Sequence, residues 1–108
     1  MQIEVTPKGQ AAIIVIVGEI DGKTAPQAQA ELQPVIQQYQ TVVLQMSSVT
    51  YLSSAGLRML LLVYRQAAAK EGKVVLVGLS EEIMDTMSMT GFLNFFQLAD
   101  SIEAALGA

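Results

Sequence analysis

Histidine and cysteine are both absent from this chain of 108 residues. Without cysteine it has no disulfide and no thiolate metal site, and a reducing compartment is the simplest expectation. Without histidine it lacks the commonest general base, the commonest metal ligand and the usual partner of a nucleophilic serine. Most hydrolase mechanisms are therefore excluded, and we expect neither a metal nor any other cofactor.

Basic residues are also scarce, with six Lys and Arg against ten Asp and Glu and a formal net charge of -4. Nucleic-acid binding needs a clustered basic face, and none is visible, so we expect no direct nucleic-acid partner. No apolar run approaches the roughly 20 residues of a membrane span, and the first residues do not resemble a signal peptide. We expect a soluble, cytoplasmic protein with no membrane partner.

Apolar residues make up 52% of the chain and charged residues only 15%, which excludes disorder and predicts a tightly filled interior. We expect one domain over residues 1–108. Runs rich in β-branched residues predict strands; these runs lie at residues 3–5, 11–17, 41–46 and 73–77, with a last short strand within 92–98. The segment 12–17 is apolar throughout, which predicts a strand covered on both faces.

Two long segments have helical periodicity. The first begins at Thr24, and Pro34 predicts a kink or break near Gln33. The second runs from Ser54 to about Glu71 after a loop at 47–53. Its core face is predicted from the i, i+3, i+4, i+7, i+11 spacing of Leu57, Leu60, Leu61, Tyr64 and Ala68. Lys70 suits the dipole of this helix, and Gly72 provides its C-terminal stop.

Shorter helices are predicted to begin at Ser80 and Asp100. Strands that alternate with helices after an initial hairpin predict an α/β fold. We expect a mixed sheet, with an antiparallel hairpin and parallel central strands, and about four helices packed against it.

The start of the second long helix differs from the other helix starts. Thr24 with Gln27, and Asp100 with Glu103, have the spacing of a capping box, and two glutamates follow Ser80. After Ser54, by contrast, come only Ala, Gly and Leu. The first N–H groups of a helix lack intrahelical partners and favour negative charge. The sequence therefore predicts an open, positively polarised helix end that displays a hydroxyl.

Three segments, in the right order and at family-like spacing, resemble the STAS domain of bacterial anti-sigma-factor antagonists. Val17-Gly18-Glu19-Ile20-Asp21 is similar to the family's Gly-Glu-Leu-Asp segment. Leu52 to Leu61 is similar to its central Asp-Ser-Ser/Thr/Ala-Gly-Leu motif, and Met89-Thr90-Gly91-Phe92 to its Met-Ser-Gly turn. The resemblance covers nearly the whole chain.

The resemblance implies a non-enzymatic phospho-switch. The unmodified protein would bind an anti-sigma-factor serine/threonine kinase, phosphorylation of Ser54 would release it, and a metal-dependent serine phosphatase would reverse the modification. Ser53 stands where the family often has Asp, which makes it a second possible acceptor. The residues that would form the partner surface are Asp21, Thr24, Ser53, Ala55, Gly56 and Arg58.

Other interpretations of these residues stay open. Ser54 could be only a helix cap, worth roughly 0.5–2 kcal/mol, or a nucleophile, although no base stands at motif spacing. The chain could also be a STAS-like ligand-binding or scaffolding module in a signalling complex that is never phosphorylated. Asp21 is typical of a turn, and Arg58 of a solvated helix face, unless it pairs with an acidic partner or a phosphate. Met84, Met87 and Met89 fill core gaps or form a docking surface.

Overall fold

The computed structural model describes residues 1–107 and confirms the predicted α/β class. Five strands form one mixed sheet in the order β1-β2-β3-β4-β5, and four α-helices pack against it. β1 and β2 are antiparallel, and every later pair of neighbours is parallel. The bounds are β1 Gln2–Lys8, β2 Ala11–Ile20, α1 Ala25–Gln38, β3 Thr41–Leu52, α2 Ser54–Ala69, β4 Lys73–Val77, α3 Glu81–Met89, the 3-10 helix η1 Phe92–Phe95, β5 Gln97–Ala99 and α4 Ile102–Leu106.

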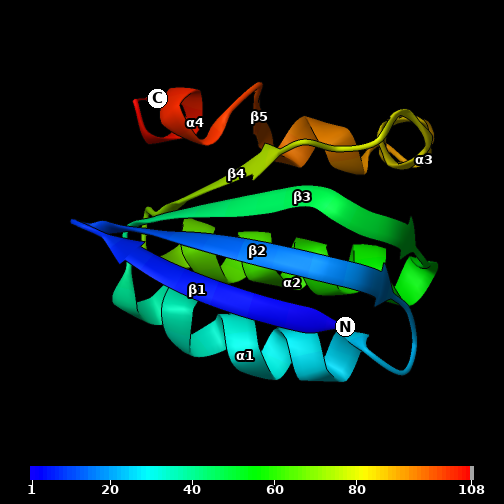
Figure 1. Cartoon of the computed structure of the whole chain (residues 1–108), viewed down its shortest axis with the longest axis horizontal. Coiled ribbons are helices and arrows are strands. Elements are labelled where there is room, and N and C mark those ends of the chain that lie inside the picture. The colour runs from blue at the N-terminus through cyan, green and yellow to red at the C-terminus, as the bar shows by residue number, and fades with distance from the viewer. Residues whose placement is uncertain (108) are drawn as a thin grey trace.

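Helices α1 and α2 lie side by side on one face of the sheet (Figure 1). Their apolar sides and the facing strands form the main core, in which Ile14, Leu32 and Leu60 are fully buried. A second, smaller cluster on the other face joins Ala105 of α4 to valines of β3 and β4. The helix layer on the main-core face therefore holds the start of α2 firmly in place.

Both central strands are longer than the sequence indicates. β3 continues to Leu52, so the predicted loop at 47–53 is wrong. Along its second half Val49 and Leu52 are buried and the two residues between them are exposed, and this spacing of three coincides with register shifts in the pairing of β3 with β2. The prediction that 12–17 is covered on both faces is also wrong, since Val17 of β2 is 40% exposed.

Helix α1 runs unbroken through Pro34, so the predicted break is wrong. Pro34 lies on the exposed side of α1, where water can satisfy the carbonyl that loses its intrahelical donor. The buried side chains of Leu32 and Ile36 anchor the helix before and after this position. Tertiary packing therefore outweighs the local cost of the proline.

The core face of α2 is only partly as predicted. Leu57 and Leu60 are buried, whereas Ala68 is exposed. Leu61 and Tyr64 are half-buried, and the remaining buried positions are Gly56, Met59, Val63 and Ala67. α2 packs against α1 as well as the sheet, so its buried stripe is wider and rotated relative to a helix with a single contact surface.

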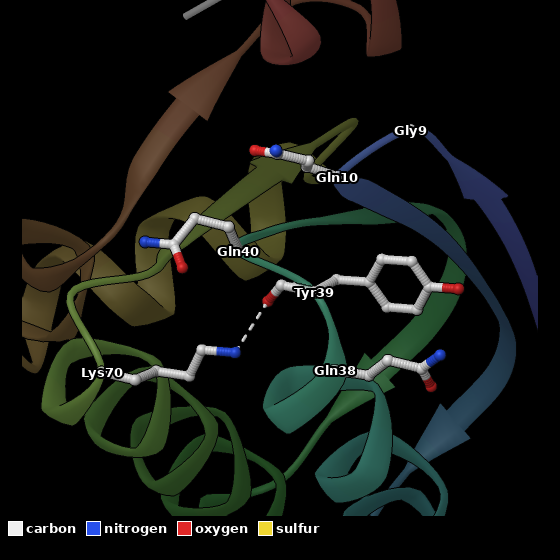
Figure 2. Close-up of a pocket in the computed structure, with 6 residues that line it drawn as sticks. All are labelled: Gly9, Gln10, Gln38, Tyr39, Gln40 and Lys70. Carbon is white, nitrogen blue, oxygen red and sulfur yellow. Dashed lines mark hydrogen bonds between the residues drawn. The ribbon is translucent and has the colours of Figure 1, made fainter.

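Lys70, which was predicted to suit the dipole of α2, binds the end of the neighbouring helix α1. Lys70 reaches across to the last turn of α1, where its Nζ donates to the carbonyls of Ile36 at 2.9 Å, Gln37 at 2.7 Å and Tyr39 at 3.3 Å. Figure 2 shows this ammonium directed at the Tyr39 carbonyl, beside a shallow pocket. Lys70 therefore closes the C-terminus of α1. The residue with left-handed backbone here is Glu71, with φ 60°, and the N–H of Gly72 donates to the Ala67 carbonyl at 2.8 Å, so Gly72 takes part in the end of α2 as predicted.

Parallel pairing determines where the predicted site residues lie. β2, β3 and β4 point the same way, so their carboxyl ends meet at one edge of the sheet. Each of these strands leads into a helix at that edge, through connections that contain Asp21, Ser53 and Ser80. Ligands and partners of open α/β sheets meet the fold at this kind of edge.

Candidate regulatory site at the start of α2

Ser53 is the N-cap of α2, so the interpretation of Ser54 as the cap is wrong. Ser53 has extended backbone, and its Oγ accepts a hydrogen bond from Gly56 N at 3.3 Å. Its own N–H donates to the carbonyl of Ile20 at 2.9 Å, which ties the cap to the end of β2. The consecutive serines therefore differ, and Ser53 has the structural role.

Ser54 is the first residue of α2, and it is exposed. Within residues 1–107 its hydroxyl makes no hydrogen bond, and the N–H groups of Ser54 and Ala55 have no protein acceptor. The first turn contains no acidic side chain. No hydrogen bond in the described part of the chain joins this hydroxyl to a lysine or a carboxylate, the groups that would have to activate it as a nucleophile in a chain without histidine. It remains accessible for modification from outside.

Gly56 has an internal reason to be glycine. A Cβ at this position would lie 2.6 Å from Leu52 Cδ1 and 2.9 Å from the carbonyl oxygen of Ile20. Both distances are too short for real contacts, so the residue allows α2 to start close against β2 and β3. Gly56 is also buried. Packing within the chain is therefore enough to explain the glycine at this position.

Asp21 and Thr24 together close the start of α1, but not as the predicted capping box. The Asp21 carboxylate accepts from the N–H groups of Lys23 at 2.9 Å and Thr24 at 3.1 Å. Thr24 Oγ1 accepts from Asp21 N and donates to the Glu19 carbonyl, while Gln27 bonds to Glu31 instead of reaching back. The hydrogen bonds from the backbone of Thr24, and then of Lys23, lower the pKa of Asp21.

The other two helix starts also have serine caps. Ser80 accepts from Ile83 N at 3.1 Å, with Glu81 and Glu82 in the first turn of α3, as predicted. At α4 the cap is Ser101, which accepts from Ala104 N at 3.1 Å. The predicted capping box that begins at Asp100 is therefore one residue too early.

A groove between the first turns of α1 and α2 lies beside Ser54, and no pattern in the sequence indicates it. Its lining residues are Gly22, Ala25, Pro26, Gln29, Ala55, Arg58, Met59 and Leu62. Arg58 is exposed and is the one charged residue in this lining. Ala55, a half-buried residue of the predicted partner surface, forms part of the wall. The apolar periodicities of α1 and α2 each indicated a helix but could not show that these two helix starts adjoin.

The methionines of α3 divide between the two roles considered for them. Met87 is fully buried and fills the core, whereas Met84 is 38% and Met89 87% exposed.

Tyr51, just before the serines, is 52% exposed and lines a small hollow with Glu82 and Thr86. Tyr51 is not among the predicted site residues, and its only signal in the sequence is its position two residues before Ser53.

The described residues contain neither a candidate metal site nor a candidate membrane-spanning helix. Nowhere within 1–107 do three or more carboxylates gather closely enough to hold a metal ion. The same part of the chain contains no helix with the length and apolar character needed to cross a membrane.

Comparison with known proteins gives consistent results. The family model described as "STAS domain" matches residues 2–105. The candidate anti-sigma factor antagonist BtrV of Bordetella bronchiseptica is 36% identical over 97 residues, which is 89% of this chain and 84% of BtrV.

Solved structures of anti-sigma factor antagonists have the same fold. One from Mycobacterium paratuberculosis aligns with a TM-score of 0.88 and 25% identity, over 98% of this chain and 91% of that one. SpoIIAA in its unphosphorylated form aligns with a TM-score of 0.80 and 19% identity, over 95% of this chain and 92% of that one. The phosphorylated form of the same Bacillus protein aligns with a TM-score of 0.75, over 95% and 96%. The chain therefore belongs to the STAS domain family, and its relatives there are anti-sigma factor antagonists.

Proposed function

We propose that this protein is an anti-sigma-factor antagonist whose binding to an anti-sigma-factor serine kinase is switched by phosphorylation of Ser54. The observation that carries the proposal is the exposed, unbonded hydroxyl of Ser54 at the start of α2. The similarity to named anti-sigma factor antagonists supports the class of partner. A metal-dependent serine phosphatase would restore the unmodified state.

The cap arrangement allows Ser54 to be modified without unfolding α2. Ser53 holds the first turn through its bond from Gly56 N, so the hydroxyl of Ser54 is not needed for the helix to start. A phosphate adds a charge of about -1.5 to -2 and a bulky group. The unpaired N–H groups of Ser54 and Ala55 favour negative charge at this point. Phosphorylation would therefore alter the surface and leave the fold unchanged.

The proposed partner surface surrounds this hydroxyl at the carboxyl edge of the sheet. It comprises Asp21, Thr24, Ser53, Ala55, Gly56 and Arg58. Asp21 and Thr24 fix the turn before α1, and Ala55 and Arg58 line the groove between α1 and α2. A kinase docked there would meet the phosphate by steric contact and by repulsion from any nearby carboxylate or nucleotide phosphate. That conflict is how the modified form would lose affinity.

The test is to recover the kinase that binds the unmodified chain, add ATP, and map the phosphate by mass spectrometry. We expect phosphate on Ser54 in the native chain and in Ser53→Ala, and none in Ser54→Ala. Phosphate on Ser53 or elsewhere would contradict the assignment. If the recovered partners include no kinase and the chain stays unmodified, the phospho-switch is wrong and a scaffolding module is the better description.

A phosphate-mimicking change tests the binding step. Ser54→Asp should weaken binding of the recovered kinase at least tenfold, about 1.4 kcal/mol, with no loss of thermal stability. Ser48→Asp, which adds the same charge at an exposed position of β3, is the matched control and should bind normally. Equal affinity of the two variants, measured by calorimetric titration, would argue against the switch.

A further inference from the structure

Arg58 lies one helical turn after Ser54 on the same side of α2. The rise between the two residues is about 6 Å. Side chains on a helix lean toward its N-terminus, so a residue at i+4 reaches back over residue i. Both side chains are exposed. An acidic group that precedes a basic one by four residues is the favourable order for an intrahelical pair.

Arg58 has no carboxylate to pair with in the described structure. α2 contains no Asp or Glu at any position, so no acid stands three or four residues from Arg58. The residues that line the groove on the α1 side are all neutral. No ion pair of Arg58 occurs within residues 1–107. Its guanidinium therefore lies beside an apolar wall and is free to bind an anion through two parallel hydrogen bonds.

We propose that a phosphate on Ser54 is held by the guanidinium of Arg58 within the same helix. This inference rests on the phosphorylation of Ser54 proposed above and adds how the modified form is stabilised. Ala55, Met59 and Leu62 line the same groove as Arg58, and an apolar lining of this kind suits the aliphatic stem of an arginine. Phosphorylation thus turns the guanidinium from the mouth of the α1–α2 groove toward the phosphate, and changes the charge and shape that the groove presents to a partner.

The test uses protein that carries phosphoserine at position 54, introduced chemically or by genetic code expansion without any kinase. A ³¹P NMR titration from pH 4 to 8 measures the second pKa of the phosphate, which is ordinarily near 6. Pairing with Arg58 stabilises the dianion, so the midpoint in the native sequence should lie about 0.3 pH unit below that of Arg58→Gln. In 1 M NaCl the difference should shrink.

Arg65→Gln is the matched control, because it removes the same charge from the same helix at another exposed position. Arg65 lies about 16 Å along the axis from Ser54, and its removal should leave the midpoint where it is in the native sequence. Arg58→Lys keeps the charge but loses the bidentate geometry, so it should retain part of the shift. A midpoint in Arg58→Gln equal to that of the native sequence would overturn the proposal.

Thermal unfolding provides a second readout. Arg58→Gln should lower the melting temperature of the unmodified protein by some amount. It should lower the melting temperature of the phosphorylated protein by a larger amount, because the substitution then also removes the pair. Equal differences would contradict the pair. No kinase is used in these measurements, so a negative result would contradict the Arg58–phosphate pair but not the proposed kinase switch. Conversely, a kinase that does not phosphorylate Ser54 would contradict the switch but not the pair.

Discussion

The residues at the two ends of α2 meet the rest of the molecule in different ways. At its last turn, Lys70 donates to the carbonyls of Ile36, Gln37 and Tyr39, and thereby closes the end of α1. At its first residue, the hydroxyl and N–H of Ser54 have no protein partner in the described structure. The first arrangement joins two neighbouring helices, and the second leaves a helix start exposed to solvent.

Burial explains why both arrangements are tolerated. The carbonyls at the end of α1 lie in a half-buried junction, where an unsatisfied acceptor costs about 1–3 kcal/mol. Ser54 is exposed, so water can satisfy its groups and the fold loses little. At these two places, the polar groups are paired where the chain packs on itself and stay open where solvent or a second protein can reach them.

Removing the charge at the closed end should have the largest effect. Lys70→Met keeps most of the stem but leaves the carbonyls of α1 without their donor. We expect a loss of about 1.5–3 kcal/mol in the free energy of unfolding, measured by urea denaturation. Lys8→Met, an exposed lysine near the same end of the sheet, should change it by less than about 0.5 kcal/mol. Similar losses for both variants would mean that Lys70 is not a special contact.

The two serines at the open end should separate in a stability measurement. Ser53→Ala removes the side chain that caps α2 and should cost about 1 kcal/mol. Ser54→Ala removes a hydroxyl without a partner and should change stability by less than about 0.5 kcal/mol. Thermal and urea unfolding of both variants would measure this difference. If the larger loss came from Ser54, the cap assignment would be wrong.

The smallest effect should come from Asp21, which closes α1 with a carboxylate where α2 has none. Backbone donors lower its pKa in the folded state, so the folded form binds this proton less readily than the unfolded form. The stabilisation is present above its unfolded pKa of about 3.9 and is lost as pH falls through the lower folded value. Unfolding curves from pH 5 to 2 should show a shallow decline that Asp21→Asn lacks. An identical decline in the variant would exclude Asp21 as its cause.

The sequence predicted the fold class well, because apolar runs and helical periodicity report element type directly. It misjudged positions where local and tertiary preferences disagree. Ser47 and Thr50 resemble loop residues, yet β3 extends past them because it stays paired with β2 as far as Leu52. Pro34 resembles a helix breaker, yet α1 continues because its neighbours are anchored in the core.

The candidate site was predicted to a similar extent. The open start of α2 and the choice of Ser54 follow from the order Ser-Ser-Ala-Gly. Which serine caps the helix did not follow, because Ser53 and Ser54 are equally good capping residues and only the backbone angles distinguish them. The place of Gly56 under Leu52 and Ile20 depended on how closely α2 approaches the strands.

What the sequence by itself determined is the chemistry available: no histidine or cysteine, two adjacent hydroxyls, and an arginine one turn further along a helix without acids. These are properties of residue type and spacing, which the chain has in any conformation. Only the tertiary structure decided which of the two serine hydroxyls accepts the capping hydrogen bond, where Lys70 binds, and that Arg58 lies beside a groove. The position of Lys70 and the groove depend on contacts between segments distant in the chain, and so does the bond from Ser53 N–H to the Ile20 carbonyl at the cap. Such contacts form only when the layers pack.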